Sequence, residues 1–166
     1  MITVNPRQLD DALRACARGI HPREAGAGLL VDCGSWLHRE DFTSRFITVG
    51  TCISDGAALL ASIDWEAAVT ALHAAELPAS GGERRMLLLA ASIAGGTPVS
   101  LNDALPGIDR RNASLVVRAV AHAAGLPDPY QETDRRHPKR LVQRKLPAVQ
   151  HALARPRPAR THRRDP

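Results

Sequence analysis

The sequence divides near residue 134 into two parts of opposite charge, and this division limits how much of the chain can build a folded core. Residues 135–166 contain 11 Lys and Arg residues and one acidic residue, Asp165, whereas residues 1–134 contain 11 basic and 16 acidic residues. Such asymmetry is typical of proteins with an anionic partner, usually nucleic acid or a membrane surface. We therefore expect an acidic folded body followed by a basic tail.

The basic tail is rich in proline and arginine and poor in apolar residues. Five of its residues have helical spacing and could form an apolar stripe: Leu141, Val142, Leu146, Val149 and Leu153. Pro147 interrupts that stripe, because proline lacks the backbone donor of a helix interior. We predict that residues 127–166 are mostly disordered and that short turns within them order only on a partner.

The body has little aromatic content, which favours closely packed helices. Hydrophobic residues make up 44% of the chain but aromatic residues only 3%, so the core must be built from Ala, Leu, Val and Ile. We predict an all-α fold, a small helical bundle with a helix-turn-helix-like C-terminal half and a disordered basic tail. The expected segments are a helical segment at 1–50, a loop or linker at 51–63, a helix-turn-helix-like segment at 64–126 and the tail at 127–166.

In the first half, Asn5 is a good N-cap with Pro6 at the first helical position, and Gly19 stops that helix. A second helix begins at Pro22, and a third is expected from Glu40 to about Ile47, packing Phe42 and Phe46. The stretch GTCISDGAALLASID at 50–64 is compatible with a loop, a short strand or a helix.

Cap residues are clearer in the second half. Asp64 caps one helix, Ser80 and Glu83 have capping-box spacing at the start of the next, and Asp109 caps the last, which Gly125 ends. A long helix, a short helix, a tight turn and another long helix follow one another, which is the order of a helix-turn-helix. Ala104 and Gly107 supply the small residue and the flexible turn that this motif needs.

The last helix provides the candidate base-reading residues, which are Arg110, Arg111, Asn112, Ser114 and Arg118. Its polar positions Arg111, Ser114, Arg118 and His122 lie on one narrow face, and donors near a helix N-terminus suit a DNA groove. Ala113, Val116, Val117 and Val120 are expected on the buried side. The alternative is that these arginines are only solvated, because any surface helix has a polar face.

The tail provides candidate phosphate contacts that need no fold, since arginine-rich segments gain affinity from counterion release. These residues are Arg135, Arg136, Lys139, Arg140, Arg144, Lys145, Arg155, Arg157, Arg160, Arg163 and Arg164. The alternative is a tail that only keeps the protein in solution.

Catalytic, metal and membrane signals are weak. Cys16, Cys33 and Cys52 form no CxxC pair, and the HRE sequence at 38–40 lacks the second half of a zinc deaminase signature. The sequence SGGERR lacks the spacing of a phosphate-binding loop. We therefore expect a cytoplasmic protein that is not an enzyme, with no catalytic residue, no metal site, no cofactor and no membrane partner.

The segment from Trp65 to Gly125 resembles a group of small uncharacterised actinobacterial proteins carried on plasmids and integrating elements. The similar features are SGGERRML, GTPVSLNDA, GIDRRN and HAAG. The resemblance implies an accessory or regulatory role on a mobile element, such as supporting its replication, transfer or transcription control.

These observations predict a nucleic-acid-associated regulatory or accessory protein, with DNA contacted through the last helix and the tail. A protein partner or a homodimer is also considered. The alternative function is a protein-interaction adaptor that has a solubilising tail and no direct role on DNA.

Overall fold

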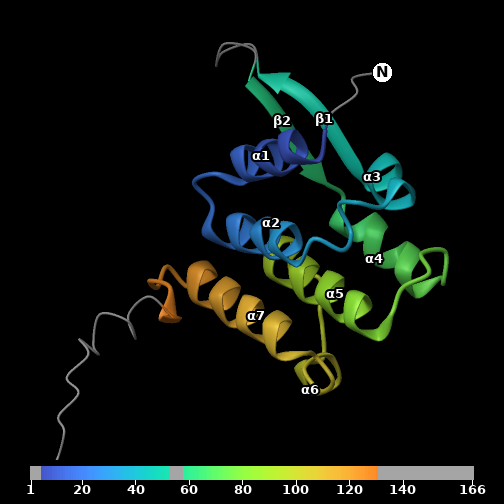
Figure 1. The fold of residues 1–166 in the computed structure, drawn as a ribbon, viewed down its shortest axis with the longest axis vertical. Coiled ribbons are helices and arrows are strands. Elements are labelled where there is room, and N and C mark those ends of the chain that lie inside the picture. The colour runs from blue at the N-terminus through green and yellow to red at the C-terminus, as the bar shows by residue number, and fades with distance from the viewer. Residues whose placement is uncertain (1–4, 53–57, 131–166) are drawn as a thin grey trace, which may run out of the picture.

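The computed structural model describes residues 5–52 and 58–130. In this part of the chain, a short hairpin lies at one end of a group of helices, beside α1 and α3 (Figure 1). The elements in order are α1 (Pro6–Ala17), α2 (His21–Cys33), α3 (Glu40–Phe46), β1 (Ile47–Cys52), β2 (Ala58–Ile63), α4 (Trp65–His73), α5 (Gly81–Gly95), α6 (Leu101–Ala104) and α7 (Arg110–Ala123). The expected tail contacts at 135–164 and the apolar positions 141–153 lie outside the described residues.

Local sequence sets the helix boundaries as predicted. Asn5 and Ser80 each form a capping box, with Gln8 and Glu83 respectively. Asp64 accepts a hydrogen bond from the Ala67 N–H at the start of α4. These side chains satisfy N–H groups that have no partner within a helix.

The prediction of a mostly helical fold is confirmed, but an all-α fold is not, because β1 and β2 form an antiparallel hairpin. In its register Ile47 lies opposite Ile63, and Val49 opposite Ala61. Residues 58–63, expected within a linker, are therefore a strand packed beside α1 (Figure 1). The β-branched residues Ile47, Thr48, Val49 and Thr51 suit a half-buried strand. Pairing with β2 decides between the local alternatives.

One hydrophobic core joins the segments expected at 1–50 and 64–126. Trp36 is fully buried, contacts the Phe42 ring, and donates from Nε1 to the Glu83 carbonyl oxygen at 3.0 Å. Leu30 of α2 and Leu87 of α5 are likewise fully buried. Helix α2 therefore depends on α5 for its burial, whereas α1 packs against β2 and α2, and α3 packs against α4 and β1.

Helix α7 lies beside α2 and α5, with α6 and the turn at Gly107 leading into it (Figure 1). The order α5, α6, α7 is the one that the sequence predicts. Helix α2 covers one side of α7, and that contact determines which residues of α7 reach solvent.

Candidate functional site

The buried side of α7 differs from the predicted one. Val116 is buried, as predicted, and Ala119 is buried as well. In contrast, Val117 is 48% exposed and Val120 is 54% exposed. Ala113 is exposed as well. The prediction that Ala113, Val117 and Val120 face the core is wrong, because the helix is rotated about its axis so that Leu115 and Ala119 face α2.

Three polar residues of α7, Arg111, Arg118 and His122, lie along the α2 side and have partners there or nearby. Arg111 donates from Nη2 to the Asp32 carbonyl oxygen at 3.1 Å, at the C-terminal end of α2. Arg118 Nε lies 2.9 Å from Asp128 Oδ2. His122 Nε2 lies 2.8 Å from Glu24 Oε2. The face expected to approach DNA thus contacts the rest of the protein, although its arginines stay exposed.

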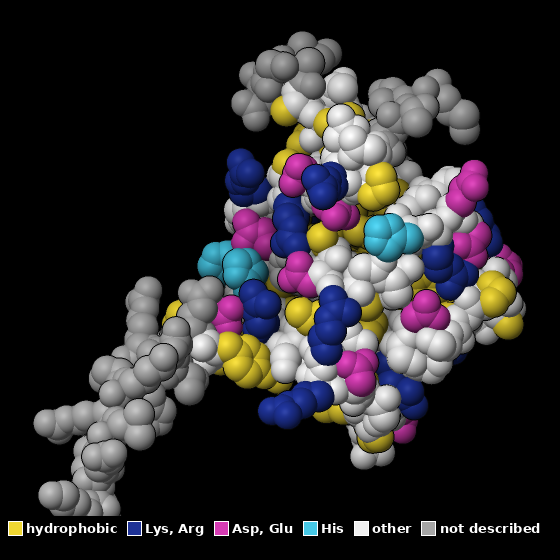
Figure 2. Space-filling view, viewed as in Figure 1, with side chains coloured by type: hydrophobic (Ala, Val, Ile, Leu, Met, Phe, Trp, Pro, Cys, Tyr) yellow, Lys and Arg dark blue, Asp and Glu magenta, His cyan; other side chains and the backbone are white. Residues whose placement is uncertain are grey.

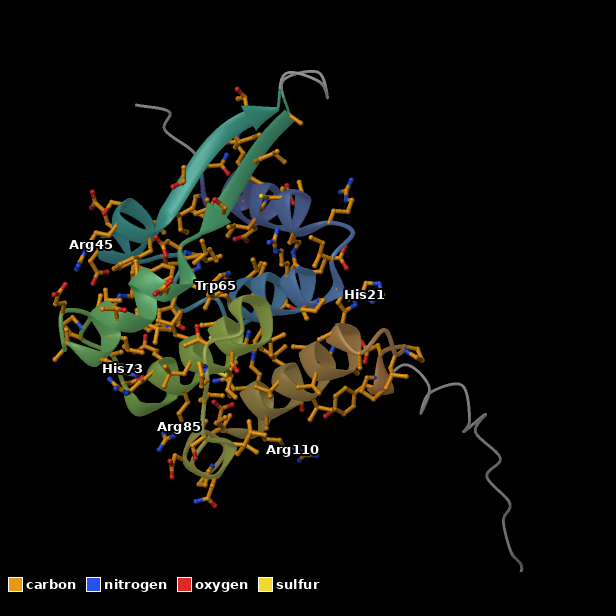
Figure 3. The ribbon with its side chains drawn as sticks, turned by 180° about the vertical axis from the view of Figure 1, so that it is seen from behind. His21, Arg45, Trp65, His73, Arg85 and Arg110 are labelled. Atoms are coloured by element: carbon orange, nitrogen blue, oxygen red, sulfur yellow. The ribbon has the colours of Figure 1, made fainter. Side chains whose placement is uncertain are left out.

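The remaining candidates sit at the start of α7. Asn112 donates from Nδ2 to Asp109 Oδ2 at 2.6 Å, and Ser114 donates from its hydroxyl to the Arg110 carbonyl oxygen at 3.0 Å. The Arg110 side chain is exposed at the outer end of the helix (Figure 3) and its guanidinium has no partner within residues 5–52 and 58–130. Arg110 is therefore the α7 arginine most open to another molecule.

A groove of about 400 Å³ lies between α1, α2 and α7. Its apolar surface comes from Ala25, Leu29, Leu115, Ala119 and Leu126. Charged residues of both signs surround this surface, which are Arg14, Arg18, Arg118, His122, Glu24, Asp32 and Asp128. Figure 2 shows basic and acidic side chains interleaved over this face of the molecule.

Most charges of this groove compensate one another. Arg14 Nη2 lies 2.6 Å from Asp32 Oδ1, which adds a third contact to the Arg118–Asp128 and His122–Glu24 pairs. Arg18 is exposed and no partner of its side chain lies in the described part of the chain. The groove therefore lacks the concentrated positive charge that phosphate binding needs.

Glu24 links the turn between α1 and α2 to α7. Its Oε1 accepts the Gly19 N–H at 2.8 Å, and this hydrogen bond, followed by the one with His122, lowers the pKa of Glu24. The His21 and His122 rings lie 5.4 Å apart between centroids. Figure 3 shows His21 beside the C-terminal end of α7.

Sequence reasoning missed Arg14, Glu24, Asp32 and Asp128 as members of this site. The partners in two of its contacts, Arg111 with Asp32 and His122 with Glu24, are separated by 79 and 98 residues. No spacing rule within one helix could have paired them.

Within residues 5–52 and 58–130, no group of three or more His, Cys, Asp or Glu side chains is placed to hold a metal ion. None of the described helices combines the length and the apolar character required to cross a membrane. Comparison with known proteins identifies no matching family model, no similar curated protein and no similar solved structure.

Proposed function

We propose that this chain is a cytoplasmic nucleic-acid-associated accessory protein whose phosphate contacts are made by the basic segment 135–164. The observation that carries the proposal is the separation of charge, with 11 Lys and Arg residues and one acidic residue in 135–166. Neutralising phosphates releases counterions from nucleic acid, which gives affinity without a fixed geometry. The role has no catalytic step, and its setting is the mobile element that the resemblance of residues 65–125 implies.

The structure of α7 favours the tail over the last helix as the phosphate-binding element. Arg111 and Arg118 contact Asp32 and Asp128, and these contacts would have to be exchanged for contacts to DNA. The side of α7 that faces solvent instead presents Val117 and Val120. Valine side chains have no donor for a base edge or a phosphate oxygen.

The experiment measures binding of the full-length protein to a random-sequence DNA duplex by fluorescence anisotropy over a series of KCl concentrations. The tail variant is R155Q/R157Q/R160Q. The matched variant R7Q/R18Q/R23Q removes the same charge from exposed arginines of the body. We expect the slope of log Kd against log[KCl] to fall by about 0.9 for each lost phosphate contact in the tail variant only. Equal slopes for the two variants would overturn the proposal.

A second candidate function is a protein-interaction adaptor whose tail only keeps the protein in solution. The exposed valines of α7 favour it, because apolar side chains gathered on one face are typical of protein contacts. This candidate predicts no salt-dependent duplex binding by the wild-type chain, in the same anisotropy experiment.

A further inference from the structure

The exposed apolar side chains of this protein are concentrated in one part of the chain. Seven large hydrophobic residues are exposed within the described residues, and six of them lie between residues 101 and 130. These six are Leu101, Leu105, Val117, Val120, Leu126 and Tyr130. They lie in α6 and its C-cap Leu105, in α7, and in the segment that follows α7.

The solvent side of α7 forms one apolar face. Ala113, Val117 and Val120 of α7 and its C-cap Ala124 are all exposed and are spaced by four, three and four residues. Residues three and four apart are neighbours on a helix surface, so these side chains lie in one row. Arg118 and His122 point to the α2 side of the helix, where their partners Asp128 and Glu24 lie. The row itself therefore carries no charge.

The order of residue types in this row (Ala, Val, Val, Ala) and their spacing are the same in both directions along the helix. When a second α7 is laid antiparallel against the first, Ala113 faces Ala124 of the second copy and Val117 faces its Val120. The two valine pairs then meet at the centre, and the small alanines at both ends let the helices approach closely. A two-fold symmetric interface requires such a self-complementary surface.

The ends of the two helices are complementary as well. In the antiparallel arrangement Arg110, which has no partner in the described part of the chain, lies beside the C-terminal end of the other α7. A cation is stabilised there by the carbonyl groups of the last turn.

We propose that the protein forms a symmetric dimer in which the α7 helices of two copies pack antiparallel through Val117 and Val120. The dimer does not depend on the proposed function. If the tails bind phosphates, as proposed above, it matters that the C-terminal ends of the two α7 helices lie at opposite ends of the helix pair. With 14 residues in α7, these ends are separated by about 21 Å at 1.5 Å per residue.

The first test is the mass of the full-length protein in solution, measured by sedimentation velocity over a wide range of protein concentrations. We expect a monomer–dimer equilibrium that V117K and V120E each weaken by roughly tenfold or more, because each places an unpaired charge in an apolar contact. I20K is the matched control, since Ile20 is also exposed, at 46%, but lies outside α7. It should leave the equilibrium unchanged.

Mixing the two variants distinguishes this geometry from other arrangements. Because Val117 faces Val120 of the other copy, V117K and V120E should associate with each other more strongly than either associates with itself. A circular-dichroism melt of each variant shows whether the monomer remains folded. If one variant unfolds, the other still tests the interface.

Three results would overturn the dimer. The first is a wild-type protein that remains monomeric at every concentration. The second is a dimer that V117K and V120E leave unchanged. The third is a monomeric protein in which V117K and V120E alter hydrogen exchange in residues 131–166. That result would mean that the apolar face binds the protein's own tail.

Discussion

At the scale of single residues, Gly26 is the position where the core has least room. A Cβ at Gly26 would lie 2.5 Å from Ala94 Cβ and 2.6 Å from the Ala90 carbonyl oxygen of α5. Real Cβ atoms do not approach other atoms so closely, so α2 and α5 would have to move apart. The close contact between α2 and α5 therefore requires glycine, which has no side chain, at residue 26.

We predict that Gly26→Ala destabilises the protein by about 1–3 kcal/mol, the usual cost of overpacking. Gly28→Ala is the matched control in the same helix, where the nearest atom to an added Cβ is the flexible Arg14 Nη1 at 3.4 Å. There the better helix propensity of alanine should stabilise by up to about 1 kcal/mol. Urea unfolding of the three proteins measures both effects, and equal shifts in the two variants would contradict this account of the α2–α5 contact.

Glu24 gives a prediction about pH. Its pKa lies below the ordinary value of 4.5 because its carboxylate accepts hydrogen bonds from Gly19 and His122. A lowered pKa in the folded state means that the stabilisation is fully present above pH 4.5 and is lost as the pH falls through the folded-state value. Glu24→Gln should therefore lower Tm near neutral pH, and the difference from wild type should shrink below pH 4.5.

Thermal unfolding followed by circular dichroism at several pH values measures this difference. Subtracting the two proteins removes the contributions of Asp41, Glu83 and Asp109, whose pKa values are also lowered. A Tm difference that stays constant down to acidic pH would show that Glu24 acts through packing and not through its charge.

At the scale of secondary-structure elements, the helix caps differ in a way that can be measured. Ser80 accepts the Glu83 N–H at the start of α5, and Glu83 in turn accepts the Ser80 N–H. Ser100 is the N-cap of α6 but makes no side-chain capping hydrogen bond. Serine thus occupies both N-cap positions, but only Ser80 makes the capping hydrogen bond.

Ser80→Ala should cost about 1 kcal/mol of unfolding free energy, the typical value of an N-cap hydrogen bond. Ser100→Ala should cost much less, since no bond is removed. Chemical denaturation of both variants provides the comparison. An equal loss of unfolding free energy in the two variants would mean that Ser80 stabilises the protein through something other than its capping bond.

At the scale of the whole molecule, the single core predicts that the protein unfolds in one step. Trp36 lies between α2 and α3, whereas Trp65 begins α4. In the variants W65F and W36F only one of these tryptophans remains. Because both halves of the body share the same core, the fluorescence and circular-dichroism transitions should have the same midpoint within each variant.

The comparison is made within each variant, so a loss of stability in either one does not affect it. Removing Trp36 also removes its hydrogen bond to Glu83, and a lower midpoint for W36F is expected on that ground. Different midpoints for fluorescence and circular dichroism would indicate two folding units, corresponding to 1–50 and 64–126.

The sequence by itself determined where α1, α4, α5 and α7 begin. The caps at Asn5, Asp64, Ser80 and Asp109 were predictable because each bond joins residues three positions apart, and that spacing is visible in the chain. Left-handed glycines such as Gly96, at φ 73°, mark helix ends for a similarly local reason.

Only the tertiary structure decided that residues 47–52 and 58–63 pair as strands and which side of α7 is buried. A short apolar run fits a strand or a helix equally well until a partner strand is present. Helix α7 has apolar residues on two sides, and pattern alone cannot choose between them. Its contacts to Asp32 and Glu24, 79 and 98 residues away in sequence, are made on the α2 side. They leave Val117 and Val120 in solvent, because the rotation of a helix depends on the neighbour against which it packs.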